Sequence, residues 1–227
     1  SVSFVFFIMP HHIERQLEKL KEKVLHLGTL VEEAIGKSIL ALSNEDTQLA
    51  QRVMDSDDDI DRMEVEVEEE CLKILALYQP VATDLRFVVS LLKINNDLER
   101  MGDLAKNIAK RVSHIAANTS FPVPHEIHVM ATHAQEMVRD CLDSVVRGDP
   151  VLARAVCEKD DQVDELRKQV YTMVMQTVKN SPDTMDTLLR IDSVSKNIER
   201  IGDMATNVAE DVIYMVEGDI VRHRMTD

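Results

Sequence analysis

Apolar residues recur every three or four positions along almost the whole chain, as they do in amphipathic helices. One clear run is Ile60, Met63, Val67, Cys71 and Ile74, and no segment alternates apolar and polar residues like a strand. Turn-forming residues interrupt the pattern near positions 44, 80, 118–124, 149 and 181. The pattern therefore predicts six helices, over residues 11–43, 46–78, 82–117, 125–147, 150–180 and 182–217.

Two of the predicted helices have a marked start. Asp149 and Ser181 each precede a proline, and both residue types accept hydrogen bonds from the free backbone amides of a first helical turn. We therefore expect Asp149 and Ser181 to be N-caps, with helices beginning at Pro150 and Pro182.

The second half of the chain repeats the first at an offset of 100 to 103 residues. ERMGD at 99–103 returns as ERIGD at 199–203, and DDDID at 57–61 corresponds to DDQVD at 160–164. The repeat predicts an all-α fold of two tandem three-helix bundles, over residues 11–117 and 125–217. Residues 118–124 form the predicted linker, 1–10 an N-terminal extension and 218–227 a C-terminal tail. We expect the natural protein to start at Met9, so that residues 1–8 are not part of it.

The repeated motifs are acidic and share one spacing. Each half has Asp-x-x-x-Asp followed by Glu-x-x-x-Asp, which gives Asp57, Asp61, Glu99, Asp103, Asp160, Asp164, Glu199 and Asp203. Acids four residues apart share a helix face and repel by about 0.2–0.5 kcal/mol per pair, which favours a cation between them. In each hairpin the two motifs lie equally far from the turn, so we expect them to meet at the border of the core and to face outward.

The ligand types restrict the metal. An all-oxygen site suits Mg, Mn, Ca or iron, and without His or Cys in the motifs a structural zinc site is disfavoured. Asn107 and Asn207 continue the four-residue spacing and are possible outer ligands. A solvated helix face is the plain alternative. Gly102 and Gly202 are interpreted as close helix contacts, and Arg100 and Arg200 as surface ion-pair partners.

Composition narrows the function further. The net charge of −15 argues against nucleic-acid binding and suits cations or basic protein surfaces. Three scattered cysteines match no zinc or disulfide pattern, so we expect reduced thiols in a cytoplasmic protein. The apolar stretch at the start has eight residues, too few to cross a membrane, so no membrane insertion is expected.

Four segments together resemble the PhoU family of phosphate-uptake regulators: QPVATDLR at 79–86, LERMGDLAKNIA at 98–109, IERIGDMATNVAEDVIY at 198–214 and EGDIVRH at 217–223. The resemblance implies two three-helix bundles without enzymatic activity. It also implies negative regulation of high-affinity phosphate transport and phosphate-regulon signalling, through the ATPase subunit of the phosphate ABC transporter and a sensor histidine kinase.

The resemblance also implies metal ions on the eight acids, in multinuclear clusters, with iron favoured and Mn, Mg, Zn or Ca as alternatives, and a homodimer. The second repeat lacks QPVATDLR and has NSPDTMD instead. Gln79, Asp84 and Arg86 are therefore candidate contacts to one partner, with turn capping as the alternative. A carboxylate-bridged metal enzyme, of phosphatase or oxidase type, and a metal-free helical scaffold remain the competing functions.

Overall fold

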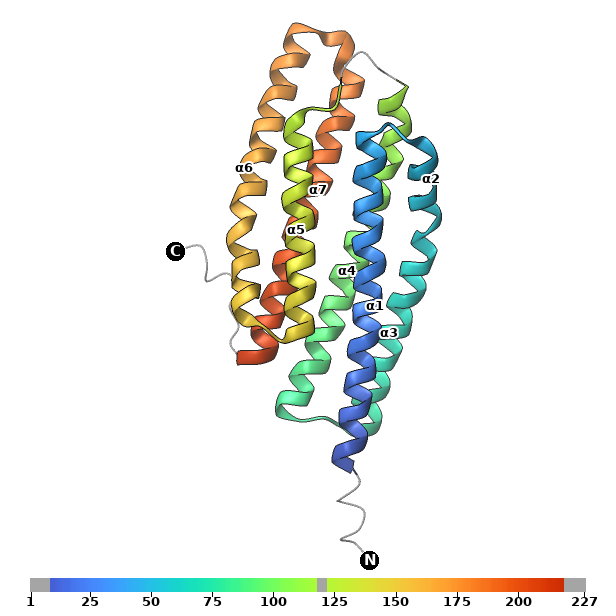
Figure 1. The fold of residues 1–227 in the computed structure, drawn as a ribbon, viewed down its shortest axis with the longest axis vertical. Helices are drawn as coiled ribbons and strands as arrows, with labels where there is room; N and C mark the ends of the chain where they lie inside the picture. The colour runs from blue at the N-terminus through green and yellow to red at the C-terminus, as the bar shows by residue number, and fades with distance from the viewer. Residues whose placement is uncertain (1–8, 118–121, 219–227) are drawn as a thin grey trace, which may run out of the picture.

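The structure, a computed structural model, describes residues 9–117 and 122–218 and contains only helices in those ranges (Figure 1). The elements are α1 Met9–Ser43, α2 Thr47–Asp55, α3 Asp57–Tyr78, α4 Ala82–Ala116, α5 His125–Arg147, α6 Pro150–Asn180, the 3₁₀ turn η1 Pro182–Thr184 and α7 Met185–Glu217. The predicted residues 1–8, most of the predicted linker (118–121) and most of the predicted tail (219–227) lie outside the described ranges.

The prediction of one helix over 46–78 is wrong, because the chain breaks at Ser56 into α2 and α3. The Ser56 hydroxyl donates to the carbonyl oxygen of Val53, 3.0 Å away, which competes with the regular helical hydrogen bonds. Three acids, Asp57, Asp58 and Asp59, form the first turn of α3, where negative charge is favoured at a new helix N-terminus. The equivalent position in the second repeat is Lys159, inside the continuous helix α6.

The two predicted caps differ in outcome. The Asp149 side chain accepts from the amides of Val151 and Leu152, and α6 begins at Pro150, as predicted. Ser181 makes no side-chain cap, and Pro182 begins the 3₁₀ turn η1 instead of an α-helix, so that prediction is wrong. The Thr184 hydroxyl and amide both donate to the Ser181 carbonyl oxygen, which closes this tighter turn before α7 starts at Met185.

The helices form two bundles that lie side by side and point in opposite directions. The first holds α1, α2, α3 and α4, the second holds α5, α6 and α7, and they meet where α4 packs on α7 and α1 on α5. In Figure 1 the α3–α4 turn lies at the lower end and the α6–α7 turn at the upper end, so α4 and α7 run antiparallel. The duplicated sequence therefore becomes an approximate two-fold arrangement, with equivalent helices facing one another.

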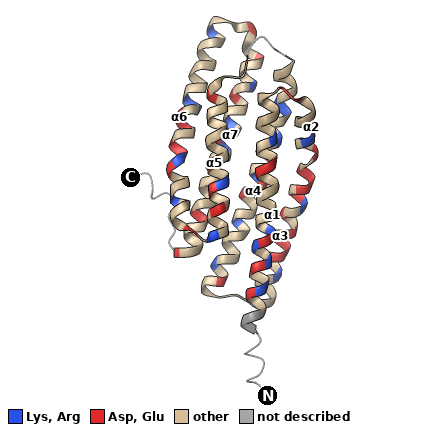
Figure 2. Cartoon of the chain, viewed as in Figure 1, with Lys and Arg blue, Asp and Glu red and all other residues tan. Residues whose placement is uncertain are grey.

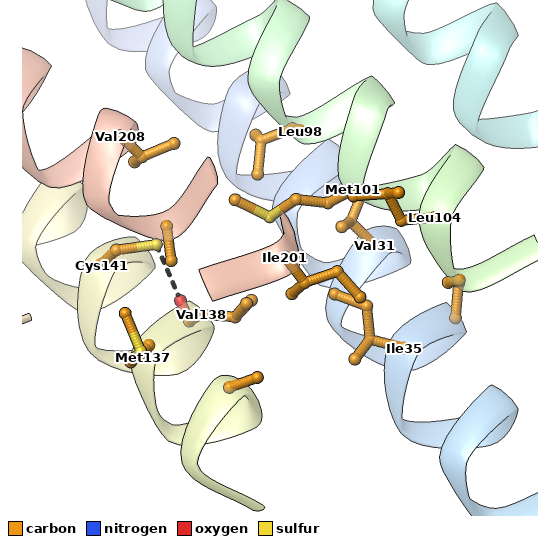
Figure 3. Close-up of a cluster of buried hydrophobic side chains, with 14 of the residues drawn as sticks. Val31, Ile35, Leu98, Met101, Leu104, Met137, Val138, Cys141, Ile201 and Val208 are labelled. Atoms are coloured by element: carbon orange, nitrogen blue, oxygen red, sulfur yellow. Dashed lines mark hydrogen bonds between the residues drawn. The ribbon is translucent and has the colours of Figure 1, made fainter. Parts of the chain in front are cut away.

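The core is continuous across the junction of the bundles. Met101 of α4 and Ile201 of α7, at equivalent positions of the repeats, are fully buried where α1, α4, α5 and α7 meet (Figure 3). Val31 and Ile35 from α1 and Met137 from α5 surround them. Because this apolar surface belongs to both repeats, neither bundle is complete alone.

Charged residues lie on the outside of this core. Figure 2 shows runs of Asp and Glu along α3, one of the helices that carry the acidic motifs. In the described ranges, none of the helices is long and apolar enough to span a membrane.

Two carboxylate clusters as a candidate metal centre

In the first bundle, acids from α3 and α4 come together at the expected height. Burial raises the pKa of Glu99, and the charges of Asp103 and Asp61 raise it further. The pKa of Asp61 is also raised, chiefly by burial, and the charge of Asp103 contributes. Glu64 belongs to the same group, because its charge raises the pKa of Glu99 and its own pKa is raised by burial and by Glu68 and Asp61. We call Asp61, Glu64, Glu99 and Asp103 the first cluster.

Asp57 does not face outward as predicted. Its side chain is buried, with 3% of its surface exposed, and it pairs with the ammonium group of Lys106 on α4. The hydrogen bond to Asp57 raises the pKa of Lys106. Asp57 lies in the first turn of α3, directly after the helix break at Ser56. Asp57 neutralises a lysine rather than joining the outward group, although its charge still helps to raise the pKa of Asp61.

In the second bundle, Asp160, Asp164, Glu199 and Asp203 form what we call the second cluster. Burial, followed by the charges of Asp203 and Asp164, raises the pKa of Asp160 to about 6. One carboxylate oxygen of Asp160, Oδ1, is buried without a hydrogen-bond partner. A buried, unpartnered carboxylate oxygen is costly in a protein, and a cation is one group that would satisfy it.

A charge reversal is one difference between the two clusters. Glu64 in the first repeat corresponds to Arg167 in the second, whose guanidinium lies 3.0 Å from Asp192 and 3.7 Å from Glu199. Arg167 lowers the pKa of Glu199, partly opposing the effect of burial. In the first cluster, Asn95 donates to Glu64 at 3.0 Å, and its amide is neutral, so this partner of Glu64 brings no positive charge.

The sequence placed Glu64 on the same helix flank as Asp57 and Asp61 without naming it as a ligand, and it gave no role to Lys106 and Arg167. The repeat alignment could have identified Glu64 and Arg167, because positions 64 and 167 are equivalent and carry opposite charges on the acidic flank. Lys106 had no such signal, since its partner Asp57 was expected to face solvent. Its equivalent is Thr206, which cannot neutralise a carboxylate.

The donor set fits a hard cation in its chemistry, because all the ligands are carboxylate oxygens. In the described part of the chain, however, no three Asp, Glu, His or Cys side chains converge closely enough to hold a metal ion. The carboxylates lie on helices and several are half-exposed, so their side chains have room to change rotamer. Burial first, and then the charges of neighbouring acids, raise the pKa values of Asp61, Glu99, Asp160 and Asp203, and a bound cation would offset both effects.

The repeated glycines lie at the inner edge of the clusters. A Cβ atom on Gly102 would lie 3.1 Å from two side-chain carbons of Ile60, so α3 and α4 approach closely there. A Cβ on Gly202 would lie 3.3 Å from Asp160 Oδ1 and 3.7 Å from the Met137 thioether. Close helix packing, the interpretation given to these glycines above, is confirmed in both repeats.

The other candidate residues lie at the edges. Asn107 lines a surface cleft beside Arg100, while the Asn207 amide is directed at the Met204 sulfur, 3.9 Å away. Gln79 ends α3 in a left-handed conformation with φ of 46°, and Asp84 lies in the first turn of α4. Arg86 packs within 3.5 Å of the position a Cβ on Gly218 would occupy, so the first hairpin turn reaches the end of α7. The partner contact of Gln79, Asp84 and Arg86 stays a prediction, with turn capping as its alternative.

Comparisons with known proteins cover both repeats. The family model described as PhoU domain matches residues 24–112 and 127–212. The phosphate-specific transport system accessory protein PhoU homolog of Aquifex aeolicus is 42% identical over 210 residues, 92% of this chain and 95% of that protein. The homolog of Pseudomonas aeruginosa is 37% identical over 220 residues, 95% of this chain and 91% of that protein.

Two solved structures of proteins named PhoU have the same fold as this chain. The crystal structure of PhoU from Pseudomonas aeruginosa has a TM-score of 0.87 at 36% identity and covers 91% of this chain and 99% of that one. The phosphate transport system regulatory protein PhoU from Streptococcus pneumoniae has a TM-score of 0.83 at 28% identity, over 92% of this chain and 99% of that one. These relatives are named as accessory or regulatory proteins and not as enzymes.

Proposed function

Because the chain belongs to the PhoU family, we propose that it is an accessory regulator of a phosphate transport system, which lowers high-affinity uptake and phosphate-regulon signalling when phosphate is plentiful. The observation that supports this proposal most strongly is the similarity to named accessory proteins along nearly the full chain, including both acidic repeats. In this role the protein is an adaptor in the cytoplasm, and it works as a homodimer.

We infer that the adaptor contacts the ATPase subunit of the transporter and a sensor histidine kinase. The first hairpin turn, at residues 79–86, has the character of a contact surface. Around Gln79 and Asp84, the apolar side chains of Leu77 and Val81 are 71% and 75% exposed. Exposed apolar groups beside polar ones are typical of protein interaction sites. The second repeat has no copy of this turn, which suits recognition by one partner.

We also propose that the two carboxylate clusters hold cations, with iron favoured and manganese, magnesium, zinc or calcium as alternatives. Asp61, Glu99 and Asp103 with Glu64 would hold them in the first bundle. Asp160, Asp164, Glu199 and Asp203 would hold them in the second, where Arg167 already supplies one positive charge. Bound cations would fix the spacing of α3 with α4 and of α6 with α7, and so stabilise the shape that partners recognise.

A deletion strain tests the regulatory role. Loss of the gene is expected to leave a phosphate-repressed reporter active in phosphate-rich medium, and a plasmid copy of the chain is expected to restore repression. Normal repression in the deletion strain would contradict the proposal.

The same assay tests the turn. Leu77→Glu with Val81→Glu places charge on the proposed contact surface and is expected to abolish complementation while leaving the protein folded. Val65→Glu, an exposed position on α3 away from the turn, is the matched control and is expected to complement. Full complementation by the double variant would mean that this turn does not contact the partner.

A further inference from the structure

A cleft lies between the two repeats on the face formed by α4 and α7. Its volume is about 410 Å³, and it is lined by Arg100, Asp103, Leu104, Asn107, Arg200 and Met204. Four of these residues form equivalent pairs, Arg100 with Arg200 and Leu104 with Met204. Since α4 and α7 run antiparallel, the duplication places one arginine from each repeat on the same cleft.

The two arginines have little to hold them within the protein. The Arg100 guanidinium lies 3.9 Å from Asp97, too far for a hydrogen bond, and its side chain is 67% exposed. No ion pair of Arg200 is found within residues 9–117 and 122–218, although Arg200 lowers the pKa of Asp203 at longer range. The expectation that both are surface ion-pair partners is therefore met only weakly, by Arg100.

We propose that this cleft binds a small tetrahedral oxyanion, of the size of inorganic phosphate, between Arg100 and Arg200. A guanidinium presents planar, paired N–H donors that match the oxygens of such an anion, and two of them can hold it from opposite sides. Asn107 adds an amide that can donate to a third oxygen. Leu104, which is buried, and Met204, which is half-buried, complete the lining with apolar groups.

Asp103 also lines the cleft, and its negative charge opposes an anion. The same residue belongs to the first cluster, where its charge raises the pKa values of Glu99 and Asp61. A cation on that cluster would neutralise Asp103 and favour the anion, and by linkage the anion would favour the cation to the same degree. This coupling rests on the proposed cation binding, whereas the arginine pair does not.

The test is binding of inorganic phosphate to the full chain, measured by equilibrium dialysis with radiolabelled phosphate. Arg100→Gln and Arg200→Gln are expected to weaken binding about tenfold each, and the double variant is expected to abolish it. Lys110→Gln removes the same charge from an exposed position of α4 outside the cleft and is expected to change affinity less than twofold. Circular dichroism confirms that each variant is folded, which we expect because both arginines are exposed.

Two results would overturn the anion site directly: no saturable phosphate binding, or equal weakening by Lys110→Gln. Undiminished binding by the double arginine variant would also overturn it, because phosphate would then be bound by the cations and not by the arginines. Repeating the dialysis with a chelator tests the coupling separately. Weaker binding without cations supports it, and unchanged binding overturns the coupling while leaving the arginine site intact. The reporter assay for regulation is independent of all these results.

Discussion

Asp57 and Asp160 occupy equivalent places in the two repeats but have different partners. Asp57 is neutralised by Lys106, while Asp160 has a buried oxygen with no partner and lies against Gly202. The difference follows from one substitution, because Thr206 stands where the first repeat has Lys106. The two carboxylate clusters of this protein are therefore not interchangeable.

Removing Lys106 tests the buried ion pair. Lys106→Met leaves the Asp57 carboxylate buried without its charged partner, and in chelator we expect unfolding free energy to fall by about 2 kcal/mol. Chemical denaturation measures this, with Lys110→Met as the exposed control, expected within about 0.5 kcal/mol of the parent. Adding Asp57→Asn to Lys106→Met should recover part of the loss, and simple additivity of the two changes would argue against the pair.

The pKa of Asp160, raised to about 6, predicts a pH dependence. In the unfolded chain an aspartate titrates near 3.9, so between about pH 4 and pH 6 the folded state binds more protons than the unfolded state. Stability of the metal-free protein therefore falls as pH rises through this range. Asp160→Asn should remove that loss, stabilising the chain by about 1–2 kcal/mol at pH 7 and having little effect at pH 4.

Urea denaturation in chelator at both pH values measures the effect of Asp160→Asn. Glu165→Gln, on the exposed face of α6, serves as the control and should change stability equally at the two pH values. An Asp160→Asn variant that is no more stable than the parent at pH 7 would mean that this carboxylate is well solvated.

At the residue scale, the sequence predicted which acids lie near one another but not which of them form ion pairs. The four-residue spacing and equal distance from the turns correctly brought Glu99 close to Asp103 and Asp61, and Glu199 close to Asp203 and Asp164. Lys106 and the arginine cleft depend on how helices rotate and approach one another, which periodicity does not determine. Whether the acids bind metal stays a prediction.

Helices approach closely at the repeated glycines Gly102 and Gly202, and the two are expected to respond differently to alanine. Alanine gains about 1 kcal/mol of helix propensity over glycine. In Gly102→Ala the new Cβ meets two carbons of β-branched Ile60 at 3.1 Å, so we expect a net loss of stability. In Gly202→Ala it meets one oxygen at 3.3 Å and a flexible methionine at 3.7 Å, so we expect a smaller loss or a gain. Thermal melting of both variants measures the order, and a more stable Gly102→Ala would contradict it.

The first hairpin, α3 with α4, tests the metal site as a unit. Glu99→Ala with Asp103→Ala removes two carboxylates from a half-exposed surface, so we expect a folded protein that loses the cations of one bundle. Elemental analysis of protein purified without chelators, beside the same measurement on Glu199→Ala with Asp203→Ala, shows which bundle holds which ion. If Glu99→Ala with Asp103→Ala keeps the metal content of the parent, the first cluster is not a metal site.

Helix bounds were the most predictable level of structure. The predicted ends of the helices at 43, 78, 147, 180 and 217 all match, because turn residues and the apolar period change together there. The break at Ser56 and the 3₁₀ turn at Pro182 were missed. Each depends on one hydroxyl that redirects a backbone hydrogen bond, and such local competition leaves the apolar pattern unchanged.

For the whole molecule, the shared core predicts that the two repeats unfold together. Lys93 of α4 lies 3.3 Å from the nearly buried Asp211 of α7, which adds a charged contact to the apolar junction at Met101 and Ile201. We expect one calorimetric transition for the chain, with equal van't Hoff and calorimetric enthalpies. Two resolved transitions would mean that each bundle is stable alone.

The opposed direction of the bundles has a consequence for assembly. The α3–α4 turn and the α6–α7 turn point away from each other at opposite ends of the molecule (Figure 1). Helix α4 has 35 residues, about 50 Å at 1.5 Å per residue. Two proteins bound at the opposite ends of this elongated helical molecule would therefore be held at a fixed separation. Either protein could be exchanged without displacing the other.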